Sequence, residues 1–213
     1  MKGINTFTLK MIALFAMLCD HVGLVFFPQH IIFRIIGRIS FPIFAYVLVE
    51  GFGHTHDVKK YMARLGVMAV VSEIPFDLMA SKKILELGHQ NIFFTLLLGI
   101  VMLYMLTKTV NPFLQFVYVA FAMWIANFLR MDYRFFGILI IFCFYYCRSN
   151  QWLKYIGITA ISLLLKGWTG CFTALSLVPI SLHNGERGRK CKWFFYIFYP
   201  AHLLAIVLIR LII

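Results

Sequence analysis

The chain of 213 residues is poor in charge, because only 13% of its residues are Asp, Glu, Lys or Arg. Soluble globular domains are typically about a quarter charged, so this composition excludes an ordinary water-soluble domain. Acidic residues are scarcest, with 8 Asp and Glu against 20 Lys and Arg. Hydrophobic residues make up 62% of the chain. Apolar surface on this scale needs lipid, which indicates an integral membrane protein.

Cysteine is also sparse and unpatterned. The 5 cysteines are odd in number, and none of them is paired in a C-x-x-C spacing. Such a set supports neither a disulfide framework nor a zinc site. The sequence therefore predicts no metal.

The formal net charge of +12 has no continuous basic face behind it. In a soluble protein this excess would suggest nucleic acid, but here Lys and Arg punctuate apolar runs. Such punctuation is typical of a membrane topology signal. We therefore expect membrane lipid around the chain and no nucleic acid partner.

Long apolar runs are what the chain has in abundance. A membrane-spanning helix needs about 20 mostly apolar residues. Candidate runs cover approximately residues 7–27, 31–52, 60–79, 91–107, 111–129, 133–147, 152–165, 168–182 and 193–213. A transmembrane β-barrel would instead show short segments of alternating polarity. The sequence predicts an all-α, polytopic helical bundle of about nine transmembrane helices, or seven if 152–182 is a re-entrant hairpin.

The first apolar run lacks the form of a cleavable signal peptide, because it continues through Phe27 and contains Lys10, Asp20 and His21. Lys and Arg are more numerous on the side of the N-terminus, and residues 186–192 form the densest basic cluster. The positive-inside rule then predicts a cytoplasmic N-terminus. With no fixed-period repeat and no long linker, residues 1–213 are expected to form one domain.

Ionisable residues lie where lipid is expected, although each costs about 2.5–3.5 kcal/mol to insert. Antiparallel packing of 7–27 against 31–52 puts Asp20 level with Arg38, and the next hairpin puts Glu73 at the same depth. Adjacent positions on a helix do not face each other, so an Asp20–Arg38 ion pair is favoured over contact between Asp20 and His21. His202 lies near mid-depth in the last run and is expected to approach this layer from another helix.

Lys10 and His21 are eleven residues apart, which puts both on one helical face about 16 Å apart along the axis. A cation at the cytoplasmic mouth and a deeper imidazole in one groove would suit an acyl-CoA, with phosphates at one end and a thioester at the other. Glu73 or a water is then the candidate that orients His21. Lys10 also lies near the depth of Glu50.

Structural readings of these residues stay open. Lys10 can snorkel to the membrane interface. His21 and His202 can be hydrogen-bonded packing residues, and Asp20, Arg38 and Glu73 can form a purely structural network.

Five segments carry a family resemblance, in the order KMIALFAMLCDHVG (10–23), RIIGRISFPIFAYVLVEG (34–51), RLGVMAVVSEIPFDL (64–78), GHQNIFFTLLLGI (88–100) and NGERGRKCKWFFYIFYPAHLL (184–204). With these segments the chain resembles the TraX family, named for the F-pilin acetylase. The resemblance implies a multi-pass protein of the bacterial inner membrane. It also implies an N-acetyltransferase that uses acetyl-CoA as co-substrate and acts on the N-terminus of a pilin or related exported peptide.

The family is similar to a wider group of transmembrane acyltransferases whose first helix carries a basic residue, ten intervening residues and a His. Lys10 and His21 match that pattern. The resemblance implies that the basic residue engages acyl-CoA and that the His is catalytic. His21 is then expected to act as a general base toward the acceptor, with a covalent acetyl-His intermediate as the alternative.

The expected site has three parts. The catalytic group comprises His21, Glu73, Arg38 and Asp20; the acetyl-CoA phosphates are assigned to Lys10, Arg64, Arg187 and Lys192; and the acceptor site or its surroundings are assigned to His202, Arg34, Glu50, Asn91 and Asp132.

Three other functions fit the same residues. One is O-acetylation of an exported glycan or cell-wall polymer. Another is a small transporter or flippase that uses the buried polar layer as its path, although the sequence shows no internal repeats of the kind that many transporters carry. The last is a pilus-assembly scaffold without chemistry, which would tolerate loss of His21.

Overall fold

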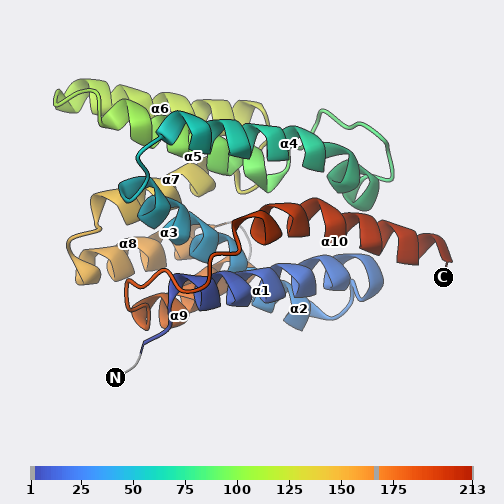
Figure 1. The fold of residues 1–213 in the computed structure, drawn as a ribbon. Coiled ribbons are helices and arrows are strands. Elements are labelled where there is room, and N and C mark those ends of the chain that lie inside the picture. The colour runs from blue at the N-terminus through green and yellow to red at the C-terminus, as the bar shows by residue number, and fades with distance from the viewer. Residues whose placement is uncertain (1–2, 166–167, 213) are drawn as a thin grey trace. The chain divides into compact units, whose positions relative to one another are not determined.

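A computed structural model describes residues 3–165 and 168–212 of the chain (Figure 1). Helix accounts for 76% of the structure, and no strand occurs in these two ranges. The prediction of an all-α chain is confirmed.

The helices follow the predicted apolar runs. They are α1 (Thr6–Phe26), α2 (Ile31–Gly37), α3 (Ser40–Gly53), α4 (Val58–Ala80), α5 (Ile92–Leu106), α6 (Pro112–Phe128), α7 (Arg134–Tyr146), α8 (Gln151–Leu164), the 3-10 helix η1 (Trp168–Ser176), α9 (Leu177–Ser181) and α10 (Lys192–Ile212). Each predicted run coincides with one or two of these elements.

Two predicted runs are not single α-helices. The run 31–52 is interrupted at residues 38–39, between α2 and α3, and the run 168–182 begins as a 3-10 helix and ends as the short α9. The predicted turn between 152–165 and 168–182 includes residues 166–167, which lie outside the described residues. Whether the chain crosses a membrane seven or nine times stays a prediction.

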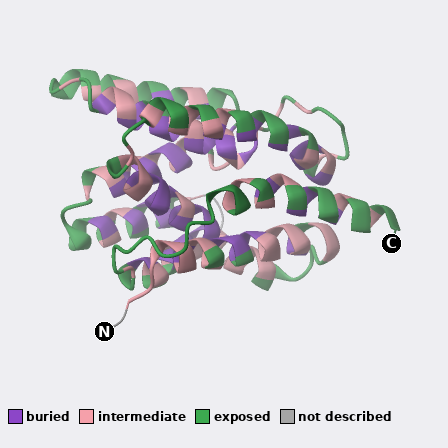
Figure 2. Ribbon diagram, viewed as in Figure 1, coloured by how far each residue is buried: buried purple, intermediate pink, exposed green. Residues whose placement is uncertain are grey.

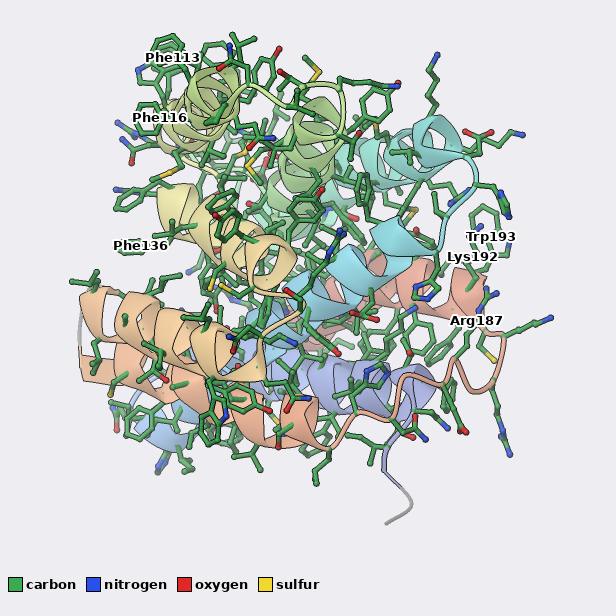
Figure 3. All side chains as sticks on the ribbon, turned by 90° about the vertical axis from the view of Figure 1, so that its left-hand side faces the viewer. Phe113, Phe116, Phe136, Arg187, Lys192 and Trp193 are labelled. Atoms are coloured by element: carbon green, nitrogen blue, oxygen red, sulfur yellow. The ribbon has the colours of Figure 1, made fainter. Side chains whose placement is uncertain are left out.

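Three helical stretches are long and apolar enough to cross a membrane by length and composition: Thr6–Phe26, Ile31–Gly53 and Lys192–Ile212. Shorter apolar helices cover Ile92–Leu106, Pro112–Phe128, Arg134–Tyr146 and Thr169–Ser181. Exposed positions line α6 and α10 in Figure 2. On α6 they include the outward-pointing rings of Phe113 and Phe116, which are 71% and 69% exposed (Figure 3). Exposed rings in such number indicate membrane association.

Short polar residues fix where several helices begin. Asn5, Asp57, Asn91 and Asn111 precede α1, α4, α5 and α6, and each side chain accepts a hydrogen bond from a backbone N–H of the first turn. Such caps satisfy donors that have no partner inside the helix. Pro112 follows Asn111 at the first helical position of α6, where proline lacks only an N–H that would otherwise go unused.

The chain divides into two compact units, one of Met1–Val47 and Tyr155–Ile213, the other of Leu48–Lys154. In the first unit, α1 packs against α2 and α10, and η1 packs against α2 and α9. In the second unit, α5 packs against α4, α6 and α7. The single domain expected from the sequence stays a prediction.

Glycine permits close helix packing inside each unit. A Cβ on Gly23 of α1 would overlap the side chain of Phe33 on α2, and a Cβ on Gly99 of α5 would overlap Ile141 of α7. The backbones therefore approach each other at these points more closely than an alanine would allow.

Candidate functional site

Two histidines of the first unit meet between α1 and α10. The Nδ1 atom of His21 lies 2.7 Å from the Nε2 atom of His202. Their ring planes are 12° from parallel, with centroids 5.0 Å apart. Such a short N···N distance between nearly parallel rings is the geometry of an imidazole–imidazole hydrogen bond. The structure thus brings together two residues that the sequence argument placed near one layer from different helices.

Aromatic neighbours hold the His202 ring. His202 is buried, the ring of Phe198 stacks on it at 5.0 Å, and Tyr199 meets both histidines edge-on. The Nδ1 atom of His202 donates a hydrogen bond of 2.8 Å to the carbonyl oxygen of Phe198, one turn earlier on α10. His21 as a whole residue is half-buried.

Asp20 lies beside His21 in sequence but bonds in another direction. One terminal nitrogen of Arg34 lies 3.0 Å from both carboxylate oxygens of Asp20, joining α1 to α2. From the sequence, the expected partner of Asp20 was Arg38, one turn further along, and that pair stays a prediction beside the observed one. The depth was nearly right, because Gly37 packs directly against Asp20. Arg34 is three residues before Gly37 on the same helical face and reaches back to the carboxylate.

The first turns of α1 carry a cation with a cationic neighbour. The Nζ atom of Lys10 lies 5.0 Å from the centre of the Phe195 ring on α10. Arg187 is near enough for the two positive charges to repel each other. Across residues 3–165 and 168–212, no carboxylate forms an ion pair with either side chain. Two neighbouring cations without a carboxylate attract an anion such as a phosphate.

The segment before α1 is tied to the segment before α10. The N–H of Ile4 donates to the carbonyl of Leu182 (2.8 Å), and the N–H of Asn184 donates back to the carbonyl of Ile4 (3.0 Å). The N–H of Thr6 donates to the carbonyl of Glu186 (2.8 Å). These backbone hydrogen bonds hold Arg187 near the start of α1. Figure 3 shows the side chains of Arg187, Lys192 and Trp193 gathered on this part of the unit.

His183 was not predicted from the sequence as a site residue. Its Nε2 lies 3.0 Å from the Thr6 hydroxyl and its Nδ1 lies 3.0 Å from the Tyr46 hydroxyl. The Thr6 hydroxyl also donates to the carbonyl of Glu186 (3.0 Å). His183 therefore joins three separate segments of the first unit. A single His in a loop carries no sequence signal for this role, because its partners are far away in the chain.

Glu73 and Asn91 meet inside the second unit. The side-chain amide of Asn91 donates to the Glu73 carboxylate and to the carbonyl of Ala69 (2.8 Å), and both Glu73 and Asn91 are buried. Two of the expected site residues are thus brought together between α4 and the start of α5. The shared layer of Glu73 with His21 would join the two units and stays a prediction.

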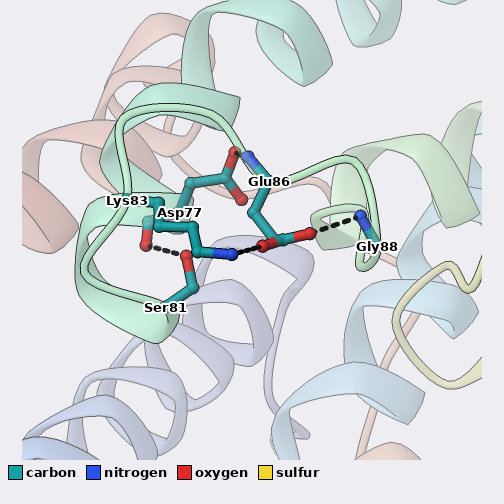
Figure 4. A network of polar contacts seen from close by, with 5 residues as sticks. All are labelled: Asp77, Ser81, Lys83, Glu86 and Gly88. Atoms are coloured by element: carbon teal, nitrogen blue, oxygen red, sulfur yellow. Dashed lines mark hydrogen bonds and ion pairs between the residues drawn. The ribbon is translucent and has the colours of Figure 1, made fainter.

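A polar network orders the connection between α4 and α5 (Figure 4). The buried Asp77 carboxylate accepts a hydrogen bond of 2.7 Å from the N–H of Glu86, and the Glu86 carboxylate accepts from Lys83 and from the N–H of Gly88. The hydrogen bond from Lys83 holds the pKa of Glu86 below its ordinary value and raises the pKa of Lys83.

The remaining expected residues are placed on other elements or in the other unit. Arg38 lies in the break between α2 and α3, and Lys192 begins α10. Arg64 of α4 lies against the ring of Tyr61 (5.6 Å), and the Asp132 carboxylate accepts from the N–H of Tyr133 (3.0 Å). Glu50 belongs, like Arg64 and Asp132, to the second unit. In the described part of the chain no group of three His, Cys, Asp or Glu is placed to hold a metal ion.

The fold and this site define a helical, membrane-associated protein with an imidazole pair between α1 and α10, and with two neighbouring cations, Lys10 and Arg187, near the start of α1. The TraX protein family matches residues 6–210, so the chain belongs to the TraX family. The resemblance stated from the sequence is confirmed.

Two relatives were found among characterised and uncharacterised proteins. A probable fimbrial assembly protein of Dichelobacter nodosus, FimC of serogroup H1, is 29% identical over 231 aligned residues, which cover 93% of each chain. An uncharacterized protein of Rickettsia prowazekii (strain Madrid E) is 31% identical over 137 residues, or 62% of this chain and 50% of its own. No solved structure gives a significant match.

Proposed function

We propose that this protein is a multi-pass acetyltransferase of the bacterial inner membrane. It moves an acetyl group from cytoplasmic acetyl-CoA to the N-terminal amine of a pilin or related exported peptide. The observation that carries the proposal is that α1 combines the imidazole pair, His21 with His202 of α10, with a cation near its start, Lys10, whose neighbour Arg187 lies in the loop before α10. Membership of the TraX family and likeness to a fimbrial assembly protein support a pilin-type acceptor.

The cationic end is suited to the phosphates of acetyl-CoA. Lys10 and Arg187 supply charge without a competing carboxylate in the described ranges, and Lys192 adds a further cation at the start of α10. From Lys10 to His21 a helix rises about 16 Å, a length that an extended pantetheine arm can bridge. Arg64 of the second unit is proposed as an additional phosphate ligand.

His21 is proposed as the general base. The acceptor nitrogen attacks the thioester carbonyl carbon while the His21 imidazole takes the proton from that nitrogen. The C–S bond then breaks, the acetyl group stays on the acceptor, and the thiolate of coenzyme A leaves with the proton from His21. Arg38 or a backbone amide is proposed to stabilise the oxyanion of the tetrahedral intermediate.

The proposal revises two roles given to carboxylates. Glu73 or a water was expected from the sequence to orient His21, and His202 is now proposed for that role because its Nε2 atom lies 2.7 Å from the Nδ1 atom of His21. Asp20 joins α1 to α2 through Arg34, so its role in the proposal is to hold His21 in register. Glu73, Asn91, Glu50 and Asp132 remain candidates for the acceptor side.

The test is acetyl transfer by the purified protein in lipid nanodiscs. Acetyl-CoA is supplied with a synthetic peptide carrying a free N-terminal amine, and the peptide mass and the released coenzyme A thiol are measured together. We expect equal amounts of acetylated peptide and free thiol, and neither product with an N-terminally blocked peptide. His21→Ala should abolish both products, whereas the control His56→Ala, at an exposed loop position, should not. Substantial transfer by His21→Ala would contradict the mechanism.

A second candidate is a pilus-assembly role without chemistry, which the name of the Dichelobacter relative favours. It predicts no thiol release with any acceptor and normal fimbriation with His21→Ala. Thiol release that requires a glycan in place of the peptide would instead identify an O-acetyltransferase. Substrate uptake into vesicles without consumption of acetyl-CoA would identify a transporter.

A further inference from the structure

From the hydrogen bonds around the histidine pair, we infer that His202 is a positioning residue that holds His21 in the tautomer with its lone pair on Nε2. The inference rests on the proposed function and adds which nitrogen of His21 takes the proton from the acceptor.

The carbonyl oxygen of Phe198 determines which ring nitrogen of His202 carries the hydrogen. A carbonyl can only accept a hydrogen bond, so the Nδ1 atom of His202, 2.8 Å away, carries a hydrogen. In the neutral imidazole only one ring nitrogen is protonated. The Nε2 atom of His202 is therefore an acceptor.

The protonation of His202 in turn determines which ring nitrogen of His21 carries the hydrogen. Because the Nε2 atom of His202 accepts, the Nδ1 atom of His21, 2.7 Å away, must donate to it. A neutral His21 with hydrogen on Nδ1 has its lone pair on Nε2. The backbone of α10 thus fixes the reactive nitrogen of a residue on α1, through one intervening imidazole.

The Phe198 carbonyl and the His202 ring are held rigidly relative to each other. Phe198 and His202 are one turn apart on α10, so the carbonyl and the ring that it orients move together. His202 is only 7% exposed; the ring of Phe198 stacks on it and the ring of Tyr199 meets it edge-on. A ring packed in this way cannot flip to present its other nitrogen without displacing its neighbours.

The carboxylate of the neighbouring Asp20 does not fix the tautomer of His21. Asp20 is adjacent to His21 on α1, where side chains project in different directions, and its carboxylate is engaged by Arg34. The arrangement resembles in logic a catalytic triad in which a third group fixes the tautomer of the base, except that the third group is a neutral imidazole. A neutral orienting group avoids placing a second charge beside the base in an apolar surrounding.

The two decisive variants at His202 differ in whether they provide a hydrogen-bond acceptor for the Nδ1 atom of His21. His202→Phe keeps a flat ring but removes the acceptor. His202→Gln keeps an acceptor oxygen and a donor amide on a side chain of similar reach. We expect His202→Phe to lower kcat about 10- to 1000-fold with the KM for acetyl-CoA changed less than about threefold, because tautomer control acts on the chemical step. His202→Gln should recover at least part of the lost kcat.

A structural role alone would give a different pattern. If His202 only fills space, the ring in His202→Phe would preserve kcat better than the amide in His202→Gln. That order of activities would overturn the inference. His56→Gln, at an exposed position, serves as the matched histidine control and should leave kcat and KM unchanged.

Nitrogen-15 NMR of the full-length protein in nanodiscs tests the tautomer without any assay, because protonated and unprotonated imidazole nitrogens have distinct shifts. The His21 signal is assigned by its loss in His21→Ala. We expect Nδ1 of His21 protonated and Nε2 unprotonated in the wild type, and a mixture of tautomers in His202→Phe. Protonation of Nε2 in the wild type would overturn the inference. If the spectrum is as expected but the wild type transfers no acetyl group, the proposed function fails and the tautomer assignment stands.

Discussion

Gly37 on α2 lies against the side chain of Asp20 on α1, and a Cβ added to Gly37 would overlap both the carboxylate and the Cβ of Asp20. Rotating the carboxylate away would not relieve the overlap, since the Asp20 Cβ is fixed by the helix backbone. This contact sets how closely α1 and α2 approach beside His21, and it positions Asp20 for its ion pair with Arg34.

Gly37→Ala should therefore force α1 and α2 apart. Overpacking of this kind typically costs about 1–3 kcal/mol of unfolding free energy. We expect a lower Tm in detergent and reduced acetyl transfer, because the backbone that carries His21 shifts. The control is Gly53→Ala at the end of α3, where an added Cβ meets no atom within 4 Å. An unchanged Tm for Gly37→Ala would show that the helices are more loosely packed than described.

The cation pair predicts a binding defect that leaves the chemical step intact. Lys10→Ala should raise the KM for acetyl-CoA about tenfold with little change in kcat, because a hydrogen bond to a charged group contributes about 1.5–3 kcal/mol. Arg187→Ala should have a similar effect, and both effects should weaken as salt is added. Lys59→Ala, an exposed lysine of α4, is the control for lost charge. An unchanged KM for Lys10→Ala would remove its phosphate role.

His183 should matter through the loop that it anchors. His183→Leu breaks its contacts with Thr6 and Tyr46 and loosens the segment that carries Arg187, which the backbone hydrogen bonds of Ile4 and Thr6 still hold. We expect a higher KM for acetyl-CoA, nearly normal kcat and faster amide exchange in residues 182–188. Tyr46→Phe removes one of the two contacts and should give a smaller change in the same direction. A loss of kcat at constant KM would contradict a purely anchoring role.

The connection between α4 and α5 predicts a local pH effect. Lys83 holds the pKa of Glu86 below its ordinary value of 4.5, so the Glu86 carboxylate is favoured in the folded state. Its contribution is therefore fully present above pH 4.5 and is lost as the pH falls through the lowered folded-state pKa. We expect amide exchange at Gly88, relative to the intrinsic rate at each pH, to accelerate below that range. Glu86→Gln should abolish this pH dependence.

Asp77 should stabilise the same connection at neutral pH. Its buried carboxylate accepts the N–H of Glu86, and Asp77→Leu would leave that N–H without its acceptor, at a cost of about 1–3 kcal/mol. Faster exchange at the Glu86 amide, with the centre of α5 unaffected, is the expected result. Uniformly faster exchange across α4 and α5 would instead indicate a global loss of stability.

Helix positions were predictable because their signals are local. Long apolar runs and capping residues such as Asn5 and Asn111 can be recognised from residues that are neighbours in the sequence. The break at residues 38–39 was not predicted, because the apolar residues on both sides favour one continuous run, although Gly37, Ser40 and Pro42 lie beside the break. The depth of Asp20 was predictable to within one residue from hairpin symmetry. The choice of Arg34 as its partner depended on which side chain reaches back along α2, which depth alone does not determine.

The histidines show the same contrast between features that local sequence predicts and features that depend on packing. His21 was found from its spacing to Lys10 on one helix, which sequence records directly. His202 was placed near its layer, but its bond to the Nδ1 atom of His21 depends on how α1 and α10 pack. The contacts of His183 with Thr6 and Tyr46 depend on three distant segments, so no local pattern could reveal them.

The measurement that tests the central claim most directly is mass spectrometry of exported pilins and peptides from cells that carry the wild-type gene, no gene, or His21→Ala at matched membrane levels. The account predicts an acetyl group on one N-terminus in the wild type, and the unmodified N-terminus in the other two strains. An acetylated N-terminus in all three strains, or equal acetylation in wild type and His21→Ala, would contradict it.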